Sequence, residues 1–344
     1  MKNLLLLGLV SSLALLSCSD DDTVVQTPET PNPTPVAEPV AKLVTASNTT
    51  GKISYTNLLN TSATTLSFSV DGMDNDGIFY NNDTDEIILA SRTNNRIETY
   101  SGLNNAIMSG MDNLSMTHTS SNMHFTNPRE IAVSGDKIIV TQDQAASNGD
   151  TNKLFVYQKS SSGYALIGDY TLDFKVWGIH MEGNDLFAIV DLTSDIVVFN
   201  NFFSMADGMI MPSKRVSIEG LVRTHGITHS IEDNVMILTD VASASDATDG
   251  GIVIISNFSS VFAATSNMGT IAMSNQKRIY GPNTALGNPV DVAYDYETNL
   301  IYVAERANGG GKVLTFDMPM MSGDIAPAFS RDEAGVASVF LHRE

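Results

Sequence analysis

The sequence contains one cysteine, one tryptophan and few basic residues, with 19 Lys and Arg against 39 Asp and Glu in 344 residues. A single cysteine excludes a disulfide framework. The formal charge of −20 disfavours binding to nucleic-acid phosphates or anionic lipid head groups, and no Lys/Arg cluster offsets it. Apolar residues at helical spacing are nearly absent after the first residues. A helical or α/β fold is therefore not expected.

The chain begins with features of a targeting segment. Lys2 supplies a positive charge, residues 4–16 form an apolar run too short to span a bilayer, and Leu15-Leu-Ser-Cys18 ends it. This pattern predicts a signal peptide over residues 1–17. Ser17-Cys18 resembles a bacterial lipobox, in which cleavage precedes a cysteine that becomes diacylated. The resemblance implies that Cys18 is lipidated; the alternative is an ordinary signal peptide followed by an incidental thiol.

A tether follows the cysteine. Ser19-Asp-Asp-Asp22 resembles the acidic run of surface-exposed lipoproteins in the Bacteroidota, which implies an outer-membrane, lipid-anchored protein exposed at the cell surface; the alternative is a solvated acidic segment with no targeting role. Residues 18–40 carry five of the eleven prolines and no hydrophobic periodicity. We expect an extended acidic and Pro-rich tether there, and one folded domain over residues 41–344.

A repeated unit organises the domain, and its best copy is residues 288–317. It contains three strand-like runs, residues 290–294, 300–304 and 312–316, separated by turn sequences. The third run recurs six times, starting at Lys52, Arg96, Lys153, Asp195, Gly251 and Lys312. A Val-, Ile- and Leu-rich second run precedes each, at residues 42–46, 87–91, 137–141, 186–190, 235–239 and 300–304. Six units of one pattern at this spacing predict the blades of a β-propeller.

The repeat also predicts how the ring closes. First-strand runs precede five copies, at residues 77–80, 130–133, 178–181, 226–229 and 291–294, and the first copy lacks one. The C-terminal run at residues 335–342 is apolar and belongs to no copy. We expect it to pair with residues 42–46, which gives an all-β, six-bladed propeller. A seventh blade built from residues 318–344 and N-terminal residues is the alternative.

The repeated unit also resembles a known family of repeats. Pro289-Val-Asp-Val-Ala293, Ile301-Tyr-Val-Ala304 and Lys312-Val-Leu-Thr-Phe-Asp317 are similar to the three strands of an NHL-type repeat, and Asn127-Pro-Arg-Glu-Ile-Ala132 repeats the first. Glu305 stands where the family has Asp after the second strand. The resemblance implies the broad NHL and YVTN-like β-propeller fold over residues 41–344. It implies no activity, because one propeller fold serves many functions.

The start of each first strand is expected to line the mouth of the central channel. The candidate ligand-binding residues there are Asp76, Arg129, Glu130, Trp177, His225 and Asp291. Acids, a base, a histidine and an indole offered for stacking would form a pocket for a polar ligand. The alternative is that Trp177 and His225 pack between blades.

Metal sites are only weakly indicated. His225 and His229 are four residues apart on a strand, about 13 Å, too far to share one ion, although His180 could approach from the preceding blade. The Met- and His-containing insertion at residues 104–127 suits copper, but flexible loops whose methionines pack on the propeller face are preferred. Acids recur in the first hairpin turn of the blades: Asp83, Asp85, Asp136, Glu182, Asp185, Glu232, Asp233, Asp295 and Glu297. They predict an acidic rim, with calcium at individual turns left open and no other cofactor expected.

No motif for nucleophilic catalysis is present, since the chain has no Gly-x-Ser-x-Gly and no thiol other than Cys18. We therefore expect an outer-membrane lipoprotein whose propeller is a binding or protein-interaction module. Its partners are the membrane, through the lipid, and a surface glycan, a peptide or a partner protein. The alternative is a calcium- or zinc-dependent hydrolase or lactonase with its site at the channel mouth, where Asp76, Glu130, Asn184 and Asp291 only loosely imitate a gluconolactonase-type metal site.

Overall fold

Residues 39–344, apart from 61 and 63, are described by the computed structural model. The predicted signal peptide, Cys18 and residues 18–38 of the predicted tether lie outside the described residues. Within the described part, no helix has the length and apolarity needed to cross a membrane.

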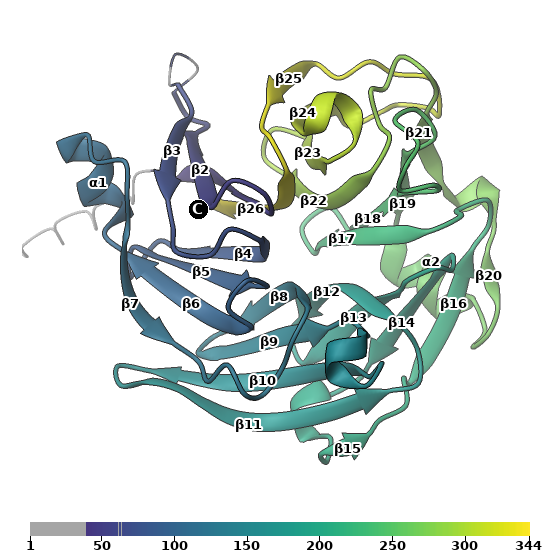
Figure 1. The fold of residues 1–344 in the computed structure, drawn as a ribbon. Helices are drawn as coiled ribbons and strands as arrows, with labels where there is room; N and C mark the ends of the chain where they lie inside the picture. Colours follow the sequence, from purple (N-terminus) through teal and green to yellow (C-terminus); the bar gives the residue numbers. More distant parts are fainter. Residues whose placement is uncertain (1–38, 61, 63) are drawn as a thin grey trace, which may run out of the picture. The chain divides into compact units, whose positions relative to one another are not determined.

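Six sheets, here called blades I to VI, surround a central channel (Figure 1). From the inside outward, blade I is β26 (Val336–Arg343), β1 (Ala41–Ser47), β2 (Lys52–Asn57) and β3 (Leu66–Ser69). Blade II is β4 (Asn75–Asn81), β5 (Glu86–Ser91), β6 (Arg96–Ser101) and β7 (Ser115–Thr119). Blade III is β8 (Pro128–Ser134), β9 (Lys137–Gln142), β10 (Asn152–Ser160), β11 (Gly163–Leu172) and the short β15 (Gly208–Met209).

The other three blades repeat this order. Blade IV is β12 (Val176–Glu182), β13 (Asp185–Val190), β14 (Asp195–Phe199), β16 (Lys214–Ile218) and the short β20 (Thr270–Ile271). Blade V is β17 (Thr224–Ser230), β18 (Val235–Asp240), β19 (Gly251–Ser256) and β21 (Lys277–Tyr280). Blade VI is β22 (Pro289–Asp295), β23 (Leu300–Glu305), β24 (Lys312–Asp317) and β25 (Phe329–Asp332).

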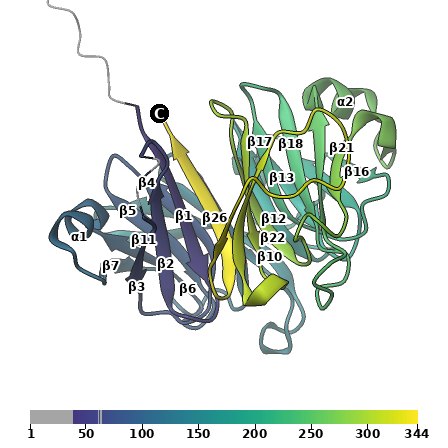
Figure 2. The same ribbon diagram turned by 90° about the horizontal axis from the view of Figure 1, so that it is seen from above.

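The ring is closed by the C-terminal strand, as the sequence predicts. β26 pairs antiparallel with β1, with Lys42 opposite His342 and Ala41 opposite Arg343. Figure 2 shows β26 lying against β1. Each inner strand also contacts the inner strand of the next blade, in the closed order β4, β8, β12, β17, β22, β26 and back to β4. The six-bladed prediction is therefore confirmed, and the seven-bladed alternative is wrong.

The predicted second and third runs are the second and third strands of all six blades. The fourth, outermost strands carry no recognisable repeat and were not predicted. β7 shows why, since four of its five residues are exposed and the fifth is only half-buried. A strand at the edge of a sheet with little buried surface leaves no apolar alternation in the sequence.

Six hydrophobic clusters hold the blades together, one between each pair of neighbours. Each cluster includes at least one Ile or Val from an inner strand, and these include Ile78, Ile131, Ile179, Ile227, Val292 and Val339. These side chains are at most 6% exposed. At about 25 cal/mol per Å² of buried apolar surface, this packing between blades is the main stabilising interaction of the ring.

The inner strands share a β-bulge near their start. In blades II to VI the register with the second strand shifts at this point, for example between Asp76 and Ile78. Gly77 has φ +71°, and a Cβ there would lie 2.8 Å from the backbone nitrogen of Ile131 in the next blade. At Gly178 a Cβ would collide with the backbone oxygen of His225. Glycine is needed because neighbouring inner strands approach closely at the bulge.

Two insertions between strands contain helices, and the one at residues 104–127 therefore differs from the expectation of flexible loops. Residues 104–127 contain most of helix α1 (Leu103–Ser109) as well as strand β7, and residues 256–276 contain α2 (Phe258–Ala264), β20 and a 3-10 turn. The helices begin with buried Leu103 and Phe258, which anchor them to the clusters between blades. Met108 and Met123 are 81% and 84% exposed, so these methionines do not pack on the propeller face.

Candidate functional site

The channel has two chemically different ends. Because all six blades repeat one strand order, their inner strands start at the same end, here called the amino end, and finish at the other, the carboxyl end. Four of the predicted site residues lie at the amino end: Asp76, Arg129, Trp177 and His225. Glu130 and Asp291 lie further along the strands and line a cavity inside the channel.

Ion pairs link blades II to V at the amino end. The chain of contacts runs Asp74–Arg92 (2.9 Å), Arg92–Asp76 (3.6 Å), Asp76–Arg129 (3.3 Å), Arg129–Asp143 (3.0 Å), Asp143–Lys175 (3.5 Å), Lys175–Asp191 (3.1 Å) and Asp191–Arg223 (2.7 Å). Four acids and four bases alternate, so their charges balance. Most of these side chains are buried or half-buried, where a paired charge is stable and an unpaired one is not.

Trp177 lies in the middle of a three-layer stack. The imidazole of His225 stacks parallel to the indole at 3.8 Å between ring centroids and 4° between planes. The guanidinium of Arg129 lies 4.2 Å from the indole centroid. Two groups this close cannot share one face, so Arg129 and His225 cover opposite faces of the indole. The predicted stacking of a ligand on this ring therefore has no free face to use.

Hydrogen bonding sets the protonation of the His225 and Asp191 pair. Burial opposes ionisation of Asp191, but hydrogen bonds from His225 and Arg223 lower its pKa overall. Burial lowers the pKa of His225 to about 4, against the opposing effect of Asp191. At neutral pH the imidazole is thus neutral, with Nε2 3.1 Å from Asp191 Oδ1. It acts as a stacking partner for Trp177 and adds no positive charge to the amino end.

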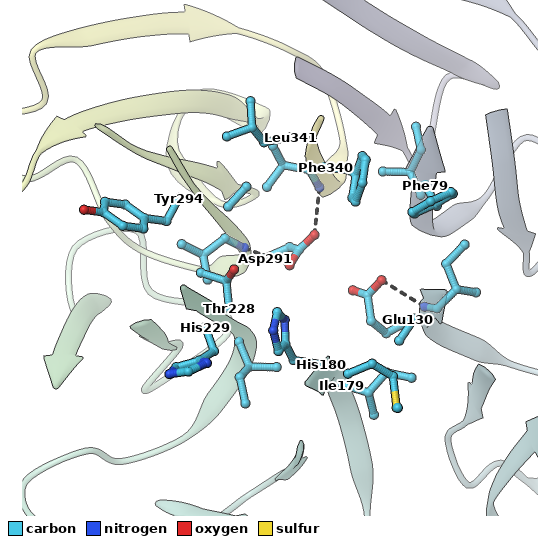
Figure 3. A pocket seen from close by; sticks show the side chains of 18 of the residues that line it. Phe79, Glu130, Ile179, His180, Thr228, His229, Asp291, Tyr294, Phe340 and Leu341 are labelled. Carbon is cyan, nitrogen blue, oxygen red and sulfur yellow. Dashed lines mark hydrogen bonds between the residues drawn. The ribbon is translucent and has the colours of Figure 1, made fainter. Parts of the chain in front are cut away.

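The channel cavity begins at Glu130 and Asp291 and extends to the carboxyl end. Its volume is about 320 Å³. Figure 3 shows the two carboxyl groups pointing into the channel from β8 and β22, with the His180 ring beside them. Both residues occupy the bulge, at the position where blades II, IV and V have Gly77, Gly178 and Gly226. Three blades without a side chain at this level leave room for the two carboxyl groups in the channel.

Backbone groups are the hydrogen-bond donors to these carboxyls. The N–H of Ile131 donates to Glu130 Oε1 (2.9 Å), and those of Val292 and Val339 donate to Asp291 Oδ1 (2.8 Å) and Oδ2 (2.7 Å). Among the described residues, no Lys, Arg or His nitrogen forms an ion pair with either group. Burial raises the pKa of Asp291 to about 7. Burial, and then the charge of Asp291, raises the pKa of Glu130 well above the ordinary carboxylic range.

Beyond the carboxyls, the wall combines apolar side chains with polar groups. Phe79 and Phe340 pack with ring centroids 4.7 Å apart, and both line the cavity with Ile179 and Thr228. Burial, followed by the charge of His229, lowers the pKa of His180 to about 4, so this wall residue is neutral at neutral pH. Arg343 is a cation of the cavity wall, and its Nε lies 3.4 Å from Asp295. A few polar groups in an apolar cavity are typical of a small-molecule site.

The acidic turns lie at the carboxyl end, because each connects an inner strand to its second strand. The exposed acids are Asp83, Asp136, Glu232, Asp233 and Glu297. Asp295 is instead buried, beside Arg343. Basic side chains at this end are partly paired, as in Lys137 with Asp136 at 3.9 Å. The carboxyl end therefore has an acidic rim that surrounds the end of the cavity.

The six candidates thus form two sets rather than one funnel. Reasoning from the sequence missed Asp143, Lys175, Asp191 and Arg223 at the amino end, as well as Phe79, Thr228 and Phe340 in the cavity. The amino-end residues had a signal: all four immediately follow a second strand or precede a first strand. His180 was considered only as a metal ligand, although its place two residues beyond the bulge glycine Gly178 matches that of Phe79 after Gly77.

Metal-ligand geometry is not found in the described part of the chain, where no three His, Cys, Asp or Glu side chains cluster suitably for an ion. The histidines considered earlier lie in different places. His225 stacks at the amino end, whereas His229 Nδ1 lies 2.8 Å from Glu182 and its ring lies 6.3 Å from that of His180.

Comparison with known proteins supports the fold alone. No protein-family model matches the chain, and no curated protein matches it in sequence. A solved nidogen/laminin complex contains a chain that is 12% identical, with a TM-score of 0.60 over 88% of this chain and 98% of that one. Proposed 6-phosphogluconolactonases are also similar: one from Bacteroides fragilis (10% identity, TM-score 0.56, 88% and 98% coverage) and one from Bacteroides uniformis (11%, 0.58, 89% and 100%).

Proposed function

We propose that this protein is an outer-membrane lipoprotein of the Bacteroidota type whose propeller is a binding module, with its ligand site in the central channel. The observation that carries the binding function is the channel cavity of about 320 Å³, in which two carboxyl groups and a neutral imidazole lie among apolar and polar wall residues. The fold has a precedent in binding, since a similar chain belongs to a solved nidogen/laminin complex.

The anchor is supported by the sequence. Cys18 is the only cysteine, it follows an apolar run and a small residue, and an acidic, Pro-rich segment follows it. A lipid on Cys18 would hold the propeller at the surface of the outer membrane, where a glycan, a peptide or a partner protein is accessible. NHL-like repeats on such a tether fit a module that presents a site rather than one that spans the membrane.

The anchor is tested by expressing the chain with Cys18→Ser and separating outer membranes from soluble material. The wild-type protein is expected with the outer membrane and the variant in the soluble fraction. Labelling with an alkynyl fatty acid should mark only the wild-type protein. A variant that still partitions with the outer membrane would show that lipidation is not the anchor.

The channel site is tested by thermal unfolding of the full chain with probes of different charge: butylammonium, butanol, butyrate, glucose and glycylglycine. At least one probe is expected to raise Tm, because a ligand that binds only the native state stabilises it. Thr228→Phe fills the cavity without changing either carboxyl group, and it should abolish that rise. If no probe raises Tm, or if Thr228→Phe leaves the rise intact, the channel is not the binding site.

The metal-dependent hydrolase is distinguished by the same measurement. Asp76 is held in ion pairs with Arg92 and Arg129, and Asp291 is held by two backbone N–H groups. Calcium or zinc that raised Tm by several degrees, with the rise lost in the Asp76→Ala, Asp291→Ala double variant, would favour the hydrolase instead.

A further inference from the structure

Resting on the binding function proposed above, we propose that the channel binds a small organic cation, whose primary ammonium group is held between Glu130 and Asp291. This names the class of ligand, which the fold and its similar structures do not specify. Three features of the cavity support it: the carboxyl pair, the chemistry of the wall, and the charge around the carboxyl end.

Among the described residues, no basic side chain pairs with the two carboxyl groups, whereas the acids at the amino end are paired with bases. At the amino end each of Asp74, Asp76, Asp143 and Asp191 contacts at least one basic side chain. Within the described residues, Glu130 and Asp291 have only backbone donors, and no hydrogen bond reaches Glu130 Oε2. Burying two acids side by side is costly unless a positive charge joins them. An ammonium group provides that charge and up to three N–H donors.

The wall suits an alkyl chain more than a hydrated metal ion. Phe79, Phe340 and Ile179 supply apolar surface in the wall of the cavity that holds the carboxyl groups. Calcium would require six or more oxygen ligands at about 2.4 Å, and the described residues place no three His, Cys, Asp or Glu side chains together for an ion. His180, neutral at neutral pH, can accept a further N–H from the ammonium group without repelling it.

The acidic rim favours the approach of a cation from the carboxyl end. Five exposed acids lie in the turns there, and the chain carries a formal charge of −20. Such a field raises the local concentration of cations and repels anions of the same size. Arg343, the guanidinium in the wall, lies beside Asp295, which offsets its positive charge.

Binding an ammonium group should also displace a proton. The positive charge favours the ionised form of both carboxyls, so the raised pKa values of Glu130 and Asp291 should fall when the cation binds. Near neutral pH the complex therefore releases a proton to solvent. Asp76 from β4 is near enough to raise both pKa values, and it pairs with Arg129 at 3.3 Å. The other titratable or charged side chains of the wall are His180 from β12, His229 from β17 and Arg343 from β26.

The proposal is tested by titration calorimetry of the full chain at about pH 7. Butylammonium is expected to bind at least about tenfold more tightly than butanol, which has the same chain without the charge. Glu130→Gln keeps the acceptor for the Ile131 N–H and removes the charge, and it should weaken binding of butylammonium about tenfold or more. Asp136→Asn, in an exposed turn, should change it less than about twofold.

Proton release provides a second readout. Titrations in two buffers of different ionisation enthalpy should give different heats for the wild-type protein and more similar heats for Glu130→Gln. Equal affinity for butanol and butylammonium, or full affinity of both Glu130→Gln and Asp291→Asn, would overturn the assignment to a cation. If another probe still bound and Thr228→Phe abolished that binding, the channel would remain the binding site. If no probe bound, both proposals would be wrong.

Discussion

The two ends of the channel handle buried acids in opposite ways. At the amino end, Asp143 and Asp191 contact Arg129, Lys175 and Arg223, so each negative charge is shared with a positive one. In the cavity, Glu130 and Asp291 are only two residues beyond the strand starts, yet among the described residues they have backbone donors alone. Paired charges with both faces of Trp177 covered make the amino end a structural plug. The acids in the cavity, which have no basic partner among the described residues, are the basis of the binding site proposed for the inner part of the channel.

The comparison also explains how one short segment serves two purposes. Arg129 and Glu130 are adjacent on β8, where the bulge separates Pro128 from Ile131 in the register with β9. The bulge turns successive side chains in directions that a regular strand would not allow. Arg129 is thereby directed to the ion pairs and Trp177, and Glu130 to the cavity. Substitutions in these two residues should therefore have different consequences.

The largest expected effect is a loss of stability when ion pairs at the amino end are broken. Arg129→Ala removes the partners of Asp76 and Asp143 and uncovers one face of Trp177, and we expect a loss of about 3 to 5 kcal/mol in the free energy of unfolding. Urea denaturation of the full chain measures it. Lys137→Ala, which breaks the exposed pair with Asp136, is the control and should cost less than about 1 kcal/mol. Similar losses in the two variants would mean that the amino end is no more tightly paired than the surface.

The next largest expected effect is a pH-dependent change in the free energy of unfolding that is caused by Asp291. The pKa of Asp291 is raised from 3.8 to about 7, so its contribution to stability is fully present below about pH 4 and is lost as pH rises through about 7. The loss is at most about 4 kcal/mol, at 1.36 kcal/mol per pH unit. Asp291→Asn should flatten this decline in urea denaturation curves measured across that range. A variant as pH-dependent as the wild-type protein would show that Asp291 is already ionised.

The cost in stability of adding side-chain atoms should also differ between the closely packed inner strands and the cavity. Gly178→Ala places a Cβ against the backbone oxygen of His225 and should cost about 1 to 3 kcal/mol. Thr228→Phe adds more atoms, but it adds them to the cavity of about 320 Å³, so the cost should be below about 1 kcal/mol. Midpoints of urea denaturation compare the two. If Thr228→Phe were the more destabilising, the cavity would be too small to hold a ligand.

The smallest expected effect is a change in the quenching of Trp177 fluorescence. Trp177 is the only tryptophan, so its fluorescence reports on the amino end alone. Arg129→Lys keeps the charge but removes the planar cover of the indole, and it should increase quenching by acrylamide. Thr228→Phe and added butylammonium should leave the quenching unchanged. A response to butylammonium would indicate that the two regions are coupled.

The sequence predicted the architecture from buried strands and predicted the site incompletely. Second strands such as β5 and β13 are buried along nearly their whole length, so they are continuous apolar runs. The closing strand was found because the apolar run at its start belonged to no blade. The sequence did not predict that the Arg129 side chain lies at the amino end while that of Glu130 lies in the cavity. A bulge shifts the alternation of side chains by one residue, and it leaves little trace in the sequence. Phe79, Thr228 and Phe340 were missed for the same reason.

The closing strand has a consequence for when the site forms. Val339, in β26, donates its N–H to Asp291 Oδ2, and Phe340 forms part of the cavity wall. β26 pairs with β1, which begins at Ala41, so the first and last strands of the domain must meet across nearly its whole length. Contacts this distant in sequence form late, since they carry the largest loop-closure entropy. During synthesis the proposed binding site therefore remains incomplete until β26 has left the ribosome, and we expect a chain that stops before Val336 to form neither a closed ring nor the cavity.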